Sequence, residues 1–295
     1  MVSGRNIGRW FAGPAGLYPL WGLLVFVLIA GSLGYVVLFA IPFGPPPPFD
    51  ASRDAQIFWA EGKLMLIVLA STAVMAAIER KDFRSYGLGG PRALPRFSWG
   101  AFWGVALMSA LAGCLIAGRQ VAIDGRLLSG ADVVAYAVAY GAAFVIAAIA
   151  EEALYRGYAQ AALARLVGFW PAAILLSLTF GLVHLSNPGE SSIAIANAVV
   201  AGIVLCLCLR LSGSLWWGIG FHAAWNWAQS FVFGAPASGF LIEKRVLEWQ
   251  AAGDPFWSGG LSGLEGSALA LPILCIAAVI VAATFRRPAA YAQSI

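Results

Sequence analysis

Long apolar runs alternate with short polar, glycine-rich or proline-rich stretches along most of the chain. Because a helix needs about 20 apolar residues to cross a bilayer, such runs predict membrane-spanning helices. The expected fold class is therefore all-α, a polytopic membrane protein that forms a single membrane domain over residues 1–295. The pattern predicts about eight transmembrane helices, over residues 17–43, 57–78, 98–118, 133–158, 170–186, 191–210, 214–233 and 268–285.

The composition supports a membrane protein. Hydrophobic residues make up 61% of the chain and charged residues 11%, whereas soluble domains carry roughly a quarter charged residues. The net charge is only +4, and no basic cluster interleaved with aromatic residues indicates nucleic acid, so membrane lipid is the expected partner. The first apolar run exceeds the roughly 7–15 residues of a signal peptide and is expected to stay as an anchor. The cysteines lie within apolar runs, which favours buried thiols over a redox or zinc pair; they are Cys114, Cys206, Cys208 and Cys275.

The long stretch over residues 234–266 is expected to lie outside the membrane. Within it, Leu241, Ile242, Val246 and Trp249 fall on one side of a helix, with charged residues opposite. This pattern is compatible with a short interfacial helix. An ordered loop that places aromatic side chains at the headgroup level is an equally good interpretation.

Ionisable groups inside spanning segments are costly and usually mark function. The first such motif, Glu151-Glu152-Ala153-Leu154-Tyr155-Arg156, ends the apolar run that starts at Val133. Glu152 and Arg156 are four residues apart, so they share a helix face and can pair. Glu151 is rotated by about 100° and needs another partner. An alternative is that both glutamates only mark where the helix leaves the membrane.

The other two motifs contain both histidines of the chain, His184 after Phe180 and His222 before Asn226. His222 and Asn226 are four residues apart and project from one helix face. Glu151 and His184 lie equally far along the chain from the turn-rich junction near residues 167–171. An antiparallel hairpin would therefore bring both to one depth, roughly 21–25 Å from the turn. We expect a shared site, although each histidine could also be a core residue and Asn226 a helix-packing residue.

A Glu, His, His and Asn set suits hydrolysis of an amide. A carboxylate in apolar surroundings can act as a general base towards water, and a neighbouring His can hold that water. A second His and an amide N–H can donate to the oxyanion that forms. No Ser or Cys lies four residues from either histidine in a nucleophile setting, so covalent catalysis is less attractive.

The three motifs resemble those of the CAAX proteases and bacteriocin-processing enzymes, also called the Abi family. Its pattern is Glu-Glu-x-x-x-Arg, then Phe-x-x-x-His, then His-x-x-x-Asn or Asp, which residues 151–226 match. The resemblance implies an eight-helix CAAX-protease-like bundle with its catalytic core at about residues 133–233, and cleavage of a membrane-associated peptide or protein tail. The implied roles are water activation by Glu151 and His184, oxyanion binding by His222 and Asn226, and orientation of the site by Glu152 and Arg156.

Several questions stay open at this stage. Glu151, His184 and His222 could ligate one zinc ion, or the reaction could need no metal. A proton-coupled transporter would also use intramembrane Glu and His, although no inverted repeat supports one. A non-catalytic scaffold or immunity protein is a third interpretation.

Basic residues predict the orientation. With the N-terminus in the cytoplasm, the cytoplasmic segments carry twelve basic residues: Arg5, Arg9, Arg80, Lys81, Arg84, Arg92, Arg96, Arg156, Arg165, Arg210, Arg286 and Arg287. The opposite side carries six: Arg53, Lys63, Arg119, Arg126, Lys244 and Arg245. This bias follows the positive-inside rule. The abundance of Arg, Ala and Gly is typical of a GC-rich bacterial gene, so the expected location is a bacterial inner membrane with both termini cytoplasmic.

The first testable prediction concerns this orientation. A topology reporter fused after Arg287 should give a cytoplasmic signal, because the basic residues there resist translocation. The same reporter inserted near Gly253 should give the signal of the opposite compartment. Swapped signals would reverse the orientation.

Overall fold

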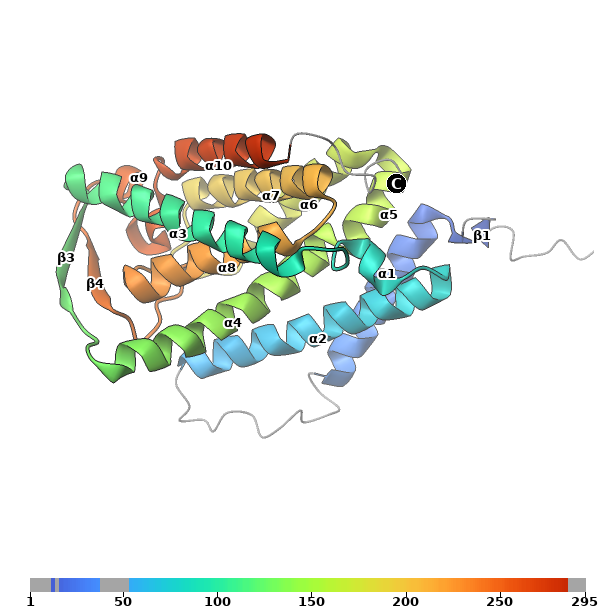
Figure 1. Ribbon diagram of the computed structural model, residues 1–295, viewed down its shortest axis with the longest axis horizontal. Helices are drawn as coiled ribbons and strands as arrows, with labels where there is room; N and C mark the ends of the chain where they lie inside the picture. The colour runs from blue at the N-terminus through green and yellow to red at the C-terminus, as the bar shows by residue number, and fades with distance from the viewer. Residues whose placement is uncertain (1–11, 14–15, 38–52, 286–295) are drawn as a thin grey trace, which may run out of the picture.

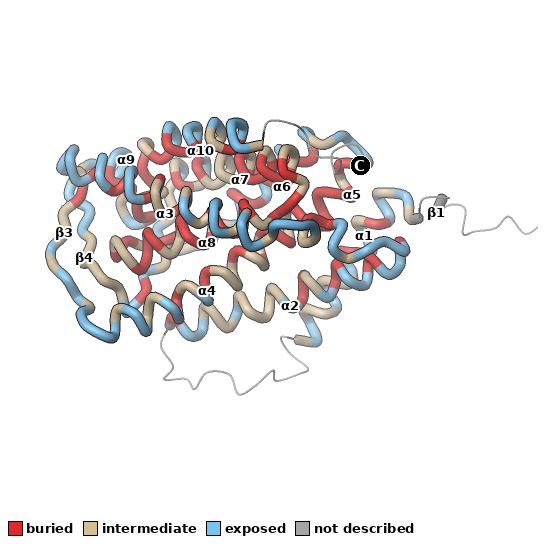
Figure 2. Tube along the Cα trace, viewed as in Figure 1, coloured by how far each residue is buried: buried red, intermediate tan, exposed pale blue. Residues whose placement is uncertain are grey.

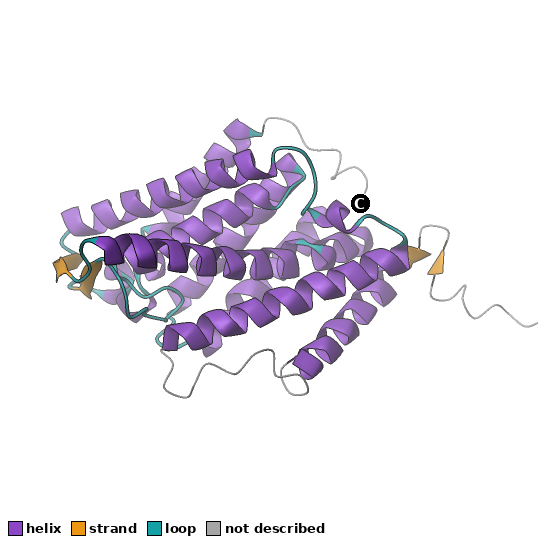
Figure 3. Ribbon diagram, turned by 60° about the horizontal axis from the view of Figure 1, so that its bottom comes forward, coloured by secondary structure: helices purple, strands orange, loops and turns teal. Residues whose placement is uncertain are grey.

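The computed structural model describes residues 12–13, 16–37 and 53–285 (Figure 1). Helices run alongside one another through most of this part, and strands occur only as two short pairs (Figure 3). The expected all-α membrane fold is confirmed. The helices are α1 (Pro19–Tyr35), α2 (Arg53–Glu79), α3 (Ala93–Ala117), α4 (Ala131–Arg156), α5 (Tyr158–Val167), α6 (Phe169–Val183), α7 (Ser192–Ser212), α8 (Trp216–Trp227), α9 (Pro255–Ser258) and α10 (Ala270–Thr284).

Five helical stretches in the described part are long and apolar enough to cross a membrane. They are Asp54–Glu79, Ala93–Ala117, Ala131–Val167, Phe169–Ser186 and Ser192–Ser212. The other three predicted spans are also helical. However, α1 and α10 are shorter, and α8 is a short helix that passes into a π-helix over Ala228–Val232. The count of eight spans stays a prediction, and residues 38–43 of the first span lie outside the described part.

The fourth predicted helix differs from the structure at its end. It was expected to run to residue 158, but α4 ends at Arg156 and a second helix, α5, begins at Tyr158. The chain bends at Gly157, whose φ is −83° and ψ −120°. A Cβ at this position would lie 2.3 Å from the carbonyl oxygen of Ala153, so only glycine fits the bend. The turn predicted near residues 167–171 joins α5 to α6, and the bend at Gly157 separates Glu151 from α5.

A buried carboxylate holds α5 in place. Glu79, at the end of α2, accepts hydrogen bonds from the hydroxyls of Tyr158 (2.7 Å) and Tyr86 (3.1 Å) and from the guanidinium of Arg165 (2.8 Å). The ammonium of Lys81 lies 3.3 Å from the same carboxylate. These partners compensate the cost of burying a charge, and they tie α5 to α2.

The interfacial helix considered for residues 241–249 does not form. Leu247–Ala251 is a strand, β4, which pairs antiparallel with β3 (Val121–Arg126) at one end of the bundle (Figures 1 and 3). The pairing satisfies backbone N–H and C=O groups that a helix would have bonded internally. The partner strand is more than 100 residues away in the chain, so the local pattern could not reveal it. The alternative, in which aromatic side chains of this segment lie at the headgroup level, stays a prediction.

Segments that carry basic residues lie at both ends of the bundle, although Arg156, which was counted with the cytoplasmic side, is buried inside it. Two segments lie at the end of the bundle opposite to β3 and β4, namely α5 and the stretch that joins α2 to α3 (Figure 1). These are the segments that the charge bias assigns to opposite sides of the membrane. The arrangement is compatible with the predicted orientation.

The helix that carries the third motif, α8, lies in the interior of the bundle and is largely buried (Figure 2). It packs closely against α3 through glycines on both helices. A Cβ on Gly100 would lie 2.0 Å from the carbonyl oxygen of Trp217, and one on Gly104 would lie 2.4 Å from that of Phe221. On α8, a Cβ on Gly220 would lie 2.1 Å from the carbonyl oxygen of Phe97. Small residues thus let the two backbones approach, as in other membrane helix pairs.

This contact generates a prediction for Gly104→Ala. The added methyl group must separate α3 from α8 beside Phe221, and overpacking of this kind costs about 1–3 kcal/mol. We expect a lower unfolding temperature in detergent. The matched control is Gly113→Ala on the same helix, where a Cβ meets nothing within 4 Å. The control should be neutral or slightly stabilising, because Ala favours helix by up to about 1 kcal/mol. Equal stability of the two variants would contradict the close packing.

Candidate active site

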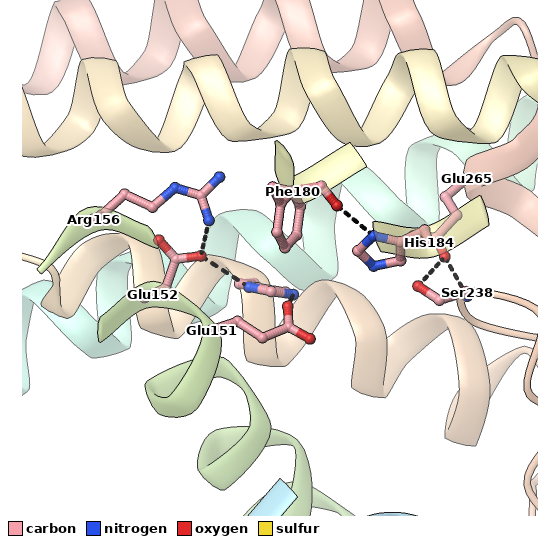
Figure 4. Close-up of polar contacts among 8 residues, drawn as sticks. Glu151, Glu152, Arg156, Phe180, His184, Ser238 and Glu265 are labelled. Atoms are coloured by element: carbon pink, nitrogen blue, oxygen red, sulfur yellow. Dashed lines mark hydrogen bonds and ion pairs between the residues drawn. The ribbon is translucent and has the colours of Figure 1, made fainter. Parts of the chain in front are cut away.

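Three helices bring the predicted site residues together. Glu151, Glu152 and Arg156 lie near the end of α4, His184 directly follows α6, and His222 and Asn226 lie on α8. Glu151, His184 and Asn226 line two adjoining cavities. In Figure 4, Phe180 lies between the charged residues of α4 and His184. Glu151, His184, His222 and Asn226 all line the narrower of these cavities, so the structure brings these four residues together.

His222 is held between the two glutamates of the first motif. Its Nδ1 lies 3.1 Å from Oε1 of Glu152, and its Nε2 lies 3.5 Å from Oε2 of Glu151. The side chain of Glu152 is 1% exposed, whereas that of Glu151 is 24% exposed. Glu152 is thus the buried anchor of the imidazole, and Glu151 is the carboxylate that reaches the cavity.

Arg156 completes this arrangement from the interior. Its Nη1 lies 3.3 Å from Oε1 of Glu152, and its side chain is fully buried. This is the pair that the four-residue spacing predicted. The guanidinium also lies over the ring of Phe180, with its central carbon 4.6 Å from the ring centroid. Arg156 therefore fixes Glu152, and Glu152 in turn fixes His222.

His184 is oriented by the backbone of its own motif. Its Nδ1 lies 2.6 Å from the carbonyl oxygen of Phe180, four residues earlier. A carbonyl oxygen only accepts, so Nδ1 must carry the proton. In neutral His184, Nε2 then has a free lone pair. This histidine lines both cavities, so that nitrogen can accept a hydrogen bond from water or substrate.

Glu151 and His184, which the sequence predicts to lie at one depth, do not contact each other directly. Among the polar contacts of the described residues, Glu151 pairs with His222, and His184 bonds to the carbonyl oxygen of Phe180. A contact between Glu151 and His184 through one water stays a prediction. The two residues still face common cavities.

Asn226 is half-buried and lines both cavities. In the described part of the chain its amide makes no hydrogen bond to another group, so helix-to-helix bonding does not explain its presence. The amide N–H groups are available to a ligand in the cavity. This is the property that an oxyanion donor needs.

The two cavities differ in size and in their walls. The narrower, about 80 Å³, lies among α6, α7, α8 and α10 and includes Glu190 and Glu265. The wider, about 260 Å³, also reaches α2 and includes Glu61. These three carboxyl groups were missed at the sequence level. Glu61 gave a usable signal, since it is an ionisable residue inside a predicted span; the other two lie in loops and gave none.

The 234–266 segment covers the site. Its Ser238 donates from the backbone N–H (2.6 Å) and the hydroxyl (3.3 Å) to Oε1 of Glu265. The amide of Asn197 on α7 donates to the carbonyl oxygen of Glu265 at 2.8 Å. The pKa of Glu190 is raised to about 7, mainly by partial burial and also by the negative charge of Glu265. The 234–266 segment therefore adds Ser238 and Glu265 as a polar, acidic wall of the narrower cavity.

The ring nitrogens of His222 lie beside carboxylates, Nδ1 near Glu152 and Nε2 near Glu151. No group of three His, Cys, Asp or Glu side chains with metal-binding geometry occurs among the described residues. Of the cysteines, Cys206 and Cys208 are buried as expected, whereas Cys114 and Cys275 are exposed.

Comparison with known proteins shows that one part of the chain matches a known family. Residues 132–228 match the model of the Rce1-like family, described as type II CAAX prenyl endopeptidase Rce1-like. The matched segment is about a third of the chain and contains all six predicted site residues. It confirms the family resemblance drawn from the three motifs and supports a CAAX-type intramembrane protease. No curated protein matches the chain.

The buried pair generates a prediction for Arg156→Ala. This change leaves the Glu152 carboxylate buried without its cation, which can cost about 3–5 kcal/mol. We expect a lower unfolding temperature, poor yield and loss of activity. Arg84→Ala, at an exposed arginine, is the control and should change little.

A double variant separates stability from orientation. Glu152→Gln with Arg156→Met removes both charges and should recover much of the lost stability. It should stay inactive, because His222 has lost its anchor. A fully active, stable Arg156→Ala protein would show that the pair is not needed.

Proposed function

We propose that this protein is an intramembrane endopeptidase that hydrolyses a peptide bond in a membrane-associated peptide or protein tail by a glutamate mechanism. The observation that carries the proposal is the position of Glu151. Its carboxylate is partly exposed to cavities that it shares with His184 and Asn226, while His222 lies 3.5 Å away. A base, a water-binding nitrogen and hydrogen-bond donors therefore surround one space.

Each residue has a role that follows from its contacts. Glu151 takes a proton from a water molecule, and the Nε2 lone pair of His184 accepts that water's other hydrogen. The water oxygen bonds to the carbonyl carbon of the substrate. The negative charge that develops on the carbonyl oxygen is stabilised by N–H groups of Asn226 and of His222 Nε2.

The remaining two residues of the motifs act through His222. Glu152 accepts a hydrogen bond from Nδ1 of His222, which turns Nε2 towards Glu151 and the cavity. Arg156 keeps Glu152 ionised and in place. Both are positioning residues, because neither is turned to the cavities.

A covalent mechanism has less support. Ser230 and Ser238 are the serines that line the wider cavity. Within the described residues the hydroxyl of Ser230 has no hydrogen-bond partner, and that of Ser238 donates to Glu265. Neither is paired with a histidine that could activate it.

The test compares native protein with Glu151→Gln in detergent or liposomes, using membrane-anchored peptides with a fluorophore and quencher around the scissile region. Removal of the base should lower kcat by about 10²–10⁴-fold. The unfolding temperature should stay close to that of the native protein. Glu248→Gln is the matched control, because this glutamate on β4 lines neither cavity, and it should retain activity.

Two further outcomes bear on the proposal. A zinc chelator should leave the native activity intact; loss that zinc restores would indicate a metal mechanism. Cleavage by Glu151→Gln at the native rate would contradict the role of Glu151 as the base. No cleavage by native protein would favour a non-catalytic scaffold, or a transporter if proteoliposomes accumulate a solute.

A further inference from the structure

The wider cavity has a carboxyl group that the three motifs do not include. Glu61 lies on α2, outside the segment that matches the family model. It lines this cavity together with Glu151 and His184. The face of α2 that borders the cavity has helical spacing and consists of Asp54, Ile57, Phe58, Glu61 and Leu64. Glu61 thus contributes a carboxyl group from α2 to the cavity that Asn226 of α8 also lines.

Nothing in the described structure neutralises Glu61. Its Oε2 is buried and has no hydrogen-bond partner. The basic residue nearest to it in the chain, Lys63, lies over the ring of Trp59, with the ammonium 5.7 Å from the ring centroid. By contrast, Asp54 on the same face accepts hydrogen bonds from Tyr140 and from the backbone of Glu243. Asp54 is explained as a structural contact, and Glu61 is not.

Glu61 and Glu151 are electrostatically linked but have different surroundings. The charges of Glu151 and of His222 both act on Glu61. Glu151 has an imidazole beside its carboxylate. Glu61 lacks such a partner, and an unpaired buried carboxyl is most stable when it is neutral. Two carboxyls in such different surroundings can divide the roles of base and acid.

We propose that Glu61 is the general acid of the active site and protonates the leaving amine, while Glu151 is the general base. The inference rests on the proposed peptidase function. It assigns a catalytic role to α2, which the sequence motifs do not reach.

The protons balance over one turnover. Glu151 removes a proton from water as the water oxygen bonds to the carbonyl carbon. The carbon–nitrogen bond then breaks, and its electron pair stays on nitrogen, which takes the proton of Glu61. Glu151 now holds one proton and Glu61 has lost one. Transfer from Glu151 to Glu61, directly or through water in the cavity, restores both groups.

The decisive experiment uses two substrates that share one acyl part and differ in the scissile bond. One is the membrane-anchored peptide with its amide, and the other is the corresponding ester. An amine must be protonated to leave, whereas an alcohol leaves far more readily without help. Loss of a general acid therefore impairs amide cleavage much more than ester cleavage, and a merely structural change impairs both alike.

The variants are Glu61→Gln and Glu61→Asp, with Glu248→Gln as the control. For Glu61→Gln we expect kcat on the amide to fall by about 10²–10⁴-fold and kcat on the ester to fall by less than about tenfold. The decline of kcat/KM at alkaline pH, which reports loss of the donor's proton, should disappear in this variant. Glu61→Asp keeps an acid and should retain that decline with an intermediate rate. Unfolding temperatures confirm that each variant is folded.

The outcomes separate this inference from the proposed function. If native protein cleaves both substrates and Glu151→Gln cleaves neither, the peptidase proposal stands whatever Glu61 does. Equal losses on amide and ester in Glu61→Gln, or an unchanged pH profile, would then overturn the role of Glu61 alone. If native protein cleaves neither substrate, the peptidase proposal fails, and the role of Glu61 fails with it.

Discussion

Burial of Arg156 within an apolar bundle imposes the constraint on which the site depends. A guanidinium without water needs a counter-charge and a partner for its face, and Glu152 and Phe180 supply them. The same oxygen of Glu152 that meets Arg156 also meets Nδ1 of His222. The orientation of the imidazole is therefore coupled to neutralisation of the arginine, and the position of Glu151 relative to His222 follows from it.

Glycines determine how the helices that carry these residues approach. Gly157 ends α4 one residue after Arg156, so the ion pair lies at the bend and α5 can turn towards Glu79. On the other side of the site, Gly100 and Gly104 of α3 let α8 lie deep in the bundle. The polar residues of α8 then face α4 and α6 instead of lipid. Backbone contact at these few positions substitutes for the hydrophobic effect, which acts weakly between helices in a membrane.

The buried polar groups differ in whether they hold the fold together or border a cavity. Glu79, whose carboxylate accepts hydrogen bonds from Tyr158, Tyr86 and Arg165, lies where helices must be held together. In the described part of the chain, Oε2 of Glu61, the lone pair of His184 and the amide of Asn226 instead have no hydrogen-bond partner, and all three residues border the wider cavity. Charges that stabilise the fold and groups that are available to a substrate thus occupy separate places in the structure.

Much of this could be predicted from the sequence, for a physical reason. Apolar runs indicated helices because a bilayer accepts few other structures. Helix geometry is local, so a four-residue spacing was enough to place Glu152 with Arg156 on one face. The same spacing placed His222 with Asn226. Tertiary structure alone decided that Glu151 meets His222 instead of His184, that residues 247–251 pair as a strand, and that α2 brings Glu61 to the cavity. These contacts depend on a bend at Gly157, on a distant partner strand and on the rotation of one helix against another. Such contacts form only when segments far apart in the chain pack together.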